Sequence, residues 1–258
     1  MVSDKLNSDT VNVVCFKWGQ MYGAEYVNKL FRMVQRNLSY EFRFVCFTDD
    51  ASGLLPQIDS QPLPDFPEPS LRYQKICAAW RKLALFKIGL ADLRGKTLFL
   101  DLDVVLMGAL DSFFDDAYCS AGAVTMLNNW YQPGSGQASV FSFVAGENQT
   151  LLDQYLDDPD GIAEKYRTEQ NYISLADPAK IKFYPDGWCL SFKKHVMPTG
   201  PLKFFASNVK PDDCKVLVFH GRPNPPDAIA GRWGKKIAWY KRWAKPIQPA
   251  PWIADYWY

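Results

Sequence analysis

Short apolar runs alternate with a longer stretch of helical periodicity in the first fifty residues. Residues 11–16 (VNVVCF) and 42–47 (FRFVCF) have the apolar, β-branched and aromatic composition of buried strands. Between them, apolar residues recur three and four positions apart, which predicts a helix over about residues 22–37. A strand, a helix and a strand in this order indicate a parallel sheet with a right-handed crossover.

The alternation continues after one proline-rich interruption. Residues 51–70 contain five prolines, which favours a loop or edge segment within one domain over a helix. A helix is predicted over residues 71–88, with Arg72, Lys75 and Lys82 on a different side from its apolar residues. Further strands are predicted near residues 98–106, 121–127, 139–146, 181–185 and 215–220, and helical stretches over 147–155 and 161–174. The pattern predicts a three-layer α/β/α domain with a mixed central sheet over residues 1–230.

Composition restricts the classes of partner and compartment. The chain has 258 residues, of which 48% are hydrophobic, so a sizeable core can form. A net charge of +1 gives no electrostatic case for binding nucleic acid. No early segment has the pattern of a secretory signal, and no stretch approaches the roughly 18 apolar residues that span a bilayer. The six cysteines form no C-x-x-C pair, which argues against a zinc cluster and favours a reducing, cytoplasmic setting.

Two carboxylates interrupt the apolar run LFLDLDVVL at residues 98–106. If the strand continues through them, Asp101 and Asp103 project to the same side, where they repel each other. Burial of an unpaired carboxylate is costly, and a divalent cation would relieve both the burial and the repulsion. The alternative is that the strand ends at Leu100 and the aspartates are solvated at a turn. Their place at the end of an apolar strand, where open α/β sheets bind ligands, favours a functional role.

A second candidate for chemistry is VLVFHGRPNP, residues 216–225. The strand predicted there ends at His220, whose neutral imidazole can bind a metal. Gly221 allows close backbone approach to a ligand, and Arg222 is a donor suited to phosphate. Taken alone, this pattern favours a strand-end histidine that only forms a hydrogen bond. In combination with Asp101 and Asp103, it predicts a metal site.

These pieces together resemble the glycosyltransferases of the GT-A fold, and more closely the glycogenin-like and lipopolysaccharide-galactosyltransferase-like members. FLDLDVVLMGALDSFF is similar to the family's D-x-D strand and the helix after it, TEQNYIS to its Asp-Gln element, and FHGRPNP to its His-x-Gly loop. KWGQMYGAEYVNKL, WRKLALF, GWCLSFKKH and HGRPNPPDAIAGRWG resemble a bacterial branch of sugar transferases of unassigned specificity. The ordered set runs along most of the chain.

The resemblance implies transfer of a sugar from a nucleotide-sugar, usually a UDP-sugar, to a glycan or lipid-linked acceptor with retention of stereochemistry. It implies Mn²⁺ or Mg²⁺ held by Asp101, Asp103 and His220, with the imidazole tilting the choice toward Mn²⁺. Metal affinity is then expected to fall as the histidine titrates, around pH 6 to 7. The implied catalytic pair is Glu169 and Gln170, with glutamate in the place of the family's aspartate. The implied donor-binding residues are Lys17, Trp18, Gly19, Tyr22, Lys82, Leu102, Gln137, Gly221 and Arg222.

Residues 231–258 form a basic, tryptophan-rich segment with two interpretations. They contain five of the nine tryptophans, and six Lys or Arg residues against one acid. Relatives in the family use such C-termini to rest on membranes, which would place the protein at the inner face of the plasma membrane beside a lipid-linked acceptor. In the alternative, the segment packs on the domain and closes the acceptor cleft.

Two other functions fit part of the pattern. A phosphohydrolase of the haloacid-dehalogenase type also places D-x-D after an apolar strand, but its motif usually opens the core domain, whereas two β-α units precede it here. A non-catalytic nucleotide-sugar-binding protein could have the same fold, but would not need the carboxylate pair and the histidine. Metal-dependent cleavage of a UDP-sugar distinguishes a transferase from both.

Overall fold

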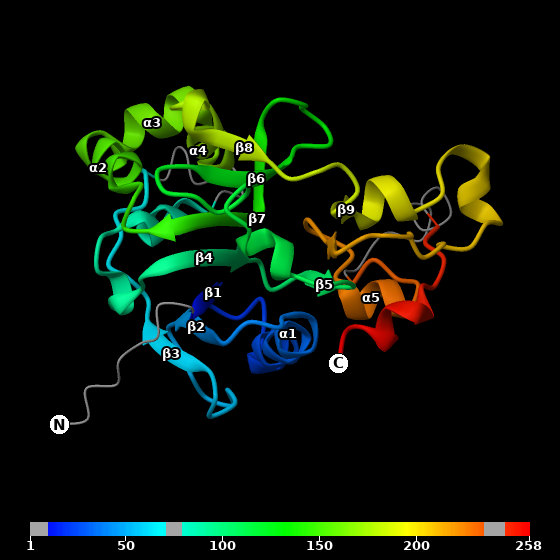
Figure 1. Ribbon diagram of the computed structural model, residues 1–258. Helices are drawn as coiled ribbons and strands as arrows, with labels where there is room; N and C mark the ends of the chain where they lie inside the picture. The colour runs from blue at the N-terminus through cyan, green and yellow to red at the C-terminus, as the bar shows by residue number, and fades with distance from the viewer. Residues whose placement is uncertain (1–9, 71–78, 235–245) are drawn as a thin grey trace.

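A mixed seven-stranded sheet lies at the centre of the computed structural model, which describes residues 10–70, 79–234 and 246–258 (Figure 1). The strand order is β3-β2-β1-β4-β7-β6-β8. Their bounds are β1 (Val11–Lys17), β2 (Phe42–Thr48), β3 (Asp59–Pro62), β4 (Gly95–Leu100), β6 (Val124–Asn128), β7 (Gly136–Ala145) and β8 (Ile181–Phe183). Only β7 runs against its neighbours, β4 and β6, and the other pairs are parallel. The predicted mixed α/β sheet is confirmed.

Helices cover both faces of this sheet and enclose two cores. Alternation along β1 places Val13 and Cys15 in one core and Val14 and Phe16 in the other. The first core contains α1 (Ala24–Asn37), whose apolar stripe is buried as its periodicity predicts. The second contains a 3₁₀ helix (Trp80–Phe86), α2 (Gln149–Asp157), α3 (Pro159–Tyr166) and α4 (Glu169–Leu175). No helix in the described parts is long and apolar enough to cross a bilayer.

Two predicted helices differ from the structure. Of the helix predicted over 71–88, residues 71–78 lie outside the described residues, and the rest forms the 3₁₀ helix Trp80–Phe86. Lys82, predicted on a different side from the apolar residues, is buried because its ammonium has carboxylate and carbonyl partners inside. The helix predicted over 161–174 is divided into α3 and α4. Arg167 adopts a positive φ of 69°, and the Thr168 side chain caps the second helix.

A second, three-stranded sheet follows the end of β4 (Figure 1). It consists of β5 (Val104–Leu106), β10 (Val216–Val218) and β9 (Cys189–Ser191), with β10 in the middle. The single strand predicted over 98–106 is therefore two strands in two sheets, separated by a turn at residues 101–103. In the antiparallel pair of β5 and β10, Val104 lies opposite Val218. This register brings the two segments predicted to carry chemistry next to each other.

The described end of the chain, residues 246–258, packs against α1. Trp257 is 8% exposed, its ring centroid lies 5.3 Å from that of Tyr26, and the Lys29 ammonium sits 4.4 Å above it. Arg36 donates to the Tyr256 carbonyl at 2.8 Å and lies 3.7 Å above the Tyr258 ring. Residues 235–245 lie outside the described residues, so membrane contact by the tail stays a prediction.

Trp257→Ala should lower the free energy of unfolding by about 3 kcal/mol, because it removes a large buried side chain and leaves a cavity beside Tyr26. Chemical denaturation followed by circular dichroism measures the change. Trp18→Ala is the matched control, since Trp18 is 42% exposed, and should change stability by less than about 0.5 kcal/mol. Equal losses in the two variants would contradict docking of the C-terminal segment on α1.

Candidate active site

The two aspartates of the D-x-D motif lie in the turn after β4, at the carboxyl edge of the sheet. The backbone N–H of Asp101 donates to the Ser139 carbonyl on β7 at 2.9 Å. The carbonyl of Asp103 accepts from the Phe219 N–H at 3.1 Å. The strand ends at Leu100, so strand alternation does not orient the two aspartate side chains. A simple turn would leave them solvated, but Asp103 is only 8% exposed. Hydrogen bonds from two different sheets hold this turn in place.

A buried lysine neutralises the first aspartate. The Lys82 ammonium lies 2.8 Å and 3.0 Å from the two carboxylate oxygens of Asp101 and donates to the Ala138 carbonyl at 2.8 Å. Burial by itself lowers the pKa of Lys82, but the charges of Asp101 and Glu169 outweigh it and the pKa is raised. Lys82 is therefore not a solvated helix lysine, and its ammonium contributes a positive charge inside the site.

The second aspartate is held by a phenol. The Tyr22 hydroxyl donates to Asp103 at 2.9 Å. Burial, followed by the negative charge of Asp101, raises the pKa of Asp103 to about 7, against the opposing effects of Tyr22 and Lys82. Without a cation, Asp103 thus holds a proton more readily than an ordinary carboxyl. Tyr22, which the sequence resemblance assigned to the nucleotide, is also a direct partner of this carboxylate.

Glu169 begins α4 and faces the same buried charges. It is 6% exposed, and its carboxylate accepts a hydrogen bond from the Ala79 N–H at 3.0 Å. Burial raises the pKa of Glu169, and the Lys82 ammonium partly offsets this. Gln170 follows in the first turn and is half-buried. The structure thus brings Glu169, Lys82 and Asp101 into one electrostatic cluster.

The register of β5 and β10 places the segment of His220 next to that of Asp103. His220 directly follows Phe219, whose N–H bonds to Asp103, but its own Nε2 lies 2.7 Å from the Ser191 hydroxyl. Burial, followed by the charge of Lys193, lowers the pKa of His220 to about 4. The imidazole is therefore neutral and able to act as a ligand near pH 7, and the titration expected at pH 6 to 7 is shifted well below that range.

Within residues 10–70, 79–234 and 246–258, no group of three or more His, Cys, Asp or Glu side chains is arranged to hold a metal ion. Lys82 binds Asp101, and Ser191 binds His220. The donor set nevertheless fits a divalent cation in its chemistry, because two crowded carboxylates and one neutral imidazole lie on adjoining segments. The raised pKa of Asp103 points to the same need for positive charge.

The predicted nucleotide-binding residues Lys17, Trp18 and Gly19 lie at the end of β1, the strand next to β4, and on the loop that follows. Lys17 donates to the Asp50 carbonyl at 2.9 Å, and the Gly19 N–H donates to the Asp49 carboxylate at 2.9 Å. Gly19 has a φ of +63°, a conformation that favours glycine. Trp18 is 42% exposed, so its ring is free to stack on a ligand.

Four further predicted residues have other partners or surroundings. Gln137 exchanges hydrogen bonds with Ser139 at 2.7 Å and 2.9 Å, beside the backbone of the D-x-D turn. The Leu102 side chain is buried in the core, and Gly221 has a φ of +70°. Arg222 forms an ion pair with Asp227 at 3.0 Å. The Arg222 guanidinium is therefore bound to Asp227. A contact between Arg222 and a phosphate would require the Arg222–Asp227 ion pair to open.

Three residues around His220 were not among the predicted site residues. Ser191 holds its imidazole, the Lys193 ammonium donates to its carbonyl at 2.5 Å, and the Trp130 ring stacks on it at 5.7 Å. Trp130 also lines a pocket of about 260 Å³, which extends toward His195 and Asp186. The pocket therefore lies beside the His220 segment, since Trp130 contacts both.

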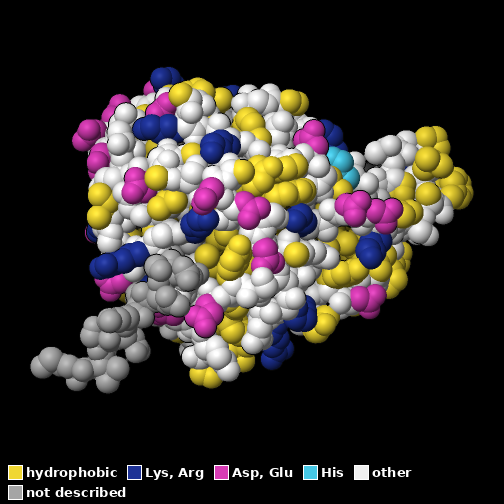
Figure 2. Space-filling view, in the orientation of Figure 1, with side chains coloured by type: hydrophobic (Ala, Val, Ile, Leu, Met, Phe, Trp, Pro, Cys, Tyr) yellow, Lys and Arg dark blue, Asp and Glu magenta, His cyan; other side chains and the backbone are white. Residues whose placement is uncertain are grey.

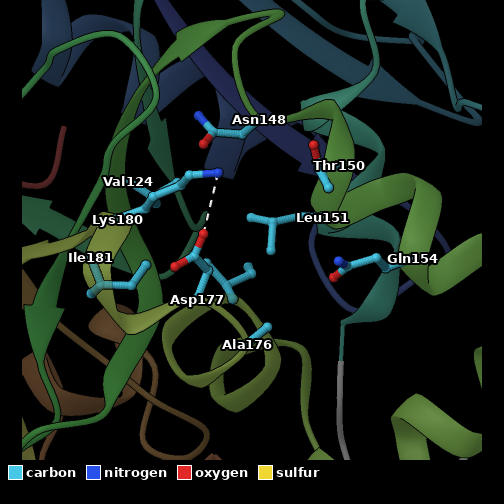
Figure 3. A pocket seen from close by; sticks show the side chains of 10 residues that line it. Val124, Asn148, Thr150, Leu151, Gln154, Ala176, Asp177, Lys180 and Ile181 are labelled. Carbon is cyan, nitrogen blue, oxygen red and sulfur yellow. Dashed lines mark ion pairs between the residues drawn. The ribbon is translucent and has the colours of Figure 1, made fainter.

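Another pocket, of about 140 Å³, lies at the opposite end of the sheet (Figure 3). It is lined by Val124 and Ile181, where β6 and β8 begin, and by the Lys180 and Asp177 ion pair, at 3.2 Å. None of the predicted site residues lines it. Because ligands of open α/β sheets bind at the carboxyl ends of strands, it is not a candidate for the donor site.

No family model matches this chain, and no curated protein matches its sequence. Solved structures do match. The galactosyltransferase LgtC, in complex with donor and acceptor sugar analogues, superposes with a TM-score of 0.56 at 15% identity over 83% of this chain and 88% of that one. The chain has the GT-A fold. An active-site variant of LgtC matches with a TM-score of 0.57 at 14% identity, over 90% of this chain and 99% of that one. The bifunctional glycosyltransferase WbbM matches with a TM-score of 0.55 at 12% identity, over 85% of this chain and 47% of that one.

Proposed function

We propose that this protein is a metal-dependent glycosyltransferase, which moves a sugar from a UDP-sugar to a glycan or lipid-linked acceptor with retention. The observation that carries the proposal is the pair of half-buried Asp101 and buried Asp103, held with Lys82 at the carboxyl end of the central strand β4. In a GT-A fold this edge is where a nucleotide-sugar would lie.

The pair and His220 are the proposed ligands of Mn²⁺ or Mg²⁺, which when bound neutralises charge on the departing diphosphate. Lys82 supplies a second positive charge that burial fixes in place. Tyr22 orients Asp103 through its hydroxyl, and Ser191 orients the His220 ring. These residues thus preorganise the part of the site that receives the diphosphate, before the donor binds.

The other proposed roles follow from exposure and position. Trp18 presents an exposed ring for the nucleobase, and Lys17 and Gly19 shape the backbone next to it. Glu169 and Gln170 are the proposed catalytic pair, at the N-terminus of α4 beside Lys82. The acceptor is proposed to enter the pocket beside Trp130. A phosphohydrolase has no specific support among these contacts.

The test is incubation of the purified chain with a panel of nucleotide-sugars and Mn²⁺, with release of free nucleotide as the readout. Slow metal-dependent cleavage of one UDP-sugar is expected, and it should disappear in Asp103→Asn. A plain phosphomonoester should stay intact. Rapid phosphomonoester cleavage would overturn the proposal in favour of the phosphohydrolase. Tight UDP-sugar binding without turnover in the presence of any acceptor extract would favour the non-catalytic binder.

A further inference from the structure

An exposed apolar loop projects from the body of the protein next to the small sheet. Residues 199–210, called here the projecting loop, carry Leu202, Phe204, Phe205 and Val209, which are 63%, 42%, 86% and 73% exposed. Figure 2 shows hydrophobic side chains gathered at the tip of this projection, away from the main sheet. Twelve large hydrophobic side chains are exposed in the described parts of the chain, and four of them lie between positions 202 and 209. Such clustering marks an interaction surface.

The charged residues within this loop are all positive, and the carboxylates of Asp212 and Asp255 lie near Lys210 at its end. Residues 191–211 contain Lys193, Lys194, Lys203 and Lys210 and no aspartate or glutamate, in a chain whose net charge is only +1. Lys194 and Lys210 are exposed. The next acidic residues along the chain, Asp212 and Asp213, come after the loop has ended. The apolar tip therefore lies on a basic segment, which is the composition that suits an anionic surface.

The same segment contacts the candidate site. It begins at Ser191, whose hydroxyl lies 2.7 Å from His220, and Lys193 donates to the His220 carbonyl at 2.5 Å. A π-helical turn, Phe192–Val196, connects these contacts to the loop, and its Phe192 stacks on Phe219 at 4.7 Å. Whatever the projecting loop binds is thus held at a fixed position relative to the site.

We propose that the projecting loop inserts into the interface of an anionic lipid bilayer and so presents the site to an acceptor carried by a lipid. Insertion buries Leu202, Phe204 and Phe205 among acyl chains, while the lysines stay at the level of the head groups. A protein partner fits less well, because a stable protein interface buries about 800 Å² on each partner and a narrow convex loop offers little area. Only the acceptor class rests on the proposed glycosyltransferase function.

The test is co-sedimentation of the full chain with vesicles containing 30% phosphatidylglycerol in phosphatidylcholine. Leu202→Ser with Phe205→Ser should weaken binding at least tenfold. The matched control is Ile88→Ser with Leu156→Ser, two exposed hydrophobic side chains elsewhere, which should leave binding unchanged. Lys203→Gln with Lys210→Gln should weaken binding to these vesicles severalfold, and pure phosphatidylcholine vesicles should bind the wild type far more weakly.

Depth of insertion supplies a second readout. The fluorescence of a Phe205→Trp variant should be quenched by brominated lipids when vesicles bind, and that of Ile88→Trp should show no added quenching over the wild type. Absence of vesicle binding by the wild type overturns the proposal, as does equal binding by the Leu202 and Phe205 variant. Loss of a dimer in that variant, without any vesicle binding, would assign the loop to self-association instead. Vesicle binding in a protein that cleaves no nucleotide-sugar would refute the proposed function and leave the membrane surface standing.

Discussion

Asp103→Asn is expected to reduce sugar transfer by roughly 10³-fold, because it removes one of two carboxylates from the proposed cation site where charge develops on the diphosphate. The fold should survive, since the amide can still accept the Tyr22 hydroxyl. The measurement is the rate of nucleotide release from the UDP-sugar that the wild type uses, at saturating Mn²⁺. Asp157→Asn, which alters an exposed carboxylate at the end of α2 and outside the candidate site, is a control for a general effect of charge. Transfer at the wild-type rate by Asp103→Asn would refute the cation role.

The same variant should stabilise the metal-free protein, and only above a certain pH. Burial and Asp101 raise the folded pKa of Asp103 to about 7, above the ordinary value of 3.8. The folded state therefore binds the proton more tightly than the unfolded state, and the ionised carboxylate is destabilising above about pH 7. Asp103→Asn should gain on the order of 1–3 kcal/mol at pH 8, and this gain should disappear as the pH falls toward 4. Urea denaturation at pH 8 and pH 4 gives the two values, and a gain of equal size at both would contradict the assignment.

Local sequence patterns predicted the central elements of the fold well. In β1 and α1, apolar periodicity alone determines which side chains are buried, since strand and helix each have a fixed repeat. The turn at Asp101 was the exception. Apolar residues continue on both sides of the two aspartates, from β4 into β5, so the local pattern does not show that the chain changes sheet there. Alternation placed the two aspartates on one side, whereas a turn held by Ser139 and Phe219 positions them in the structure.

The site required contacts that are distant in sequence. Lys82 lies 19 residues before Asp101, and Tyr22 lies 81 residues before Asp103. Sequence resemblance named both residues but gave them phosphate and nucleotide roles, because it contains no information on which side chain neutralises which carboxylate. Ser191 lies in the resembling segment GWCLSFKKH but was given no role, since one hydroxyl before a helical turn is indistinguishable from an ordinary cap. Its importance depends on the pairing of β9 with β10, which places Ser191 opposite Val218.

His220→Ala is expected to weaken Mn²⁺ binding in the presence of UDP by roughly 10- to 100-fold and to depress transfer to a similar degree. His195→Ala is the matched control, because its Nδ1 accepts the Ser191 N–H at 3.0 Å and the ring has no contact with either aspartate. The control should change metal affinity by less than about twofold. Isothermal titration with Mn²⁺ and UDP measures both variants, and equal losses would remove His220 from the site.

The pH dependence of that binding identifies the group that competes with the cation. His220, with its pKa lowered to about 4 by burial and by Lys193, stays neutral from pH 5 upward. Asp103, with its pKa raised to about 7, takes up a proton in this range and must lose it when the cation binds. Mn²⁺ affinity should therefore fall below about pH 7 in the wild type and fall with the same midpoint in His220→Ala. If the pH dependence vanishes in His220→Ala, the titrating group is the His220 imidazole. The pKa of His220 would then lie above that of Asp103, which is the opposite of the order derived from burial and charge.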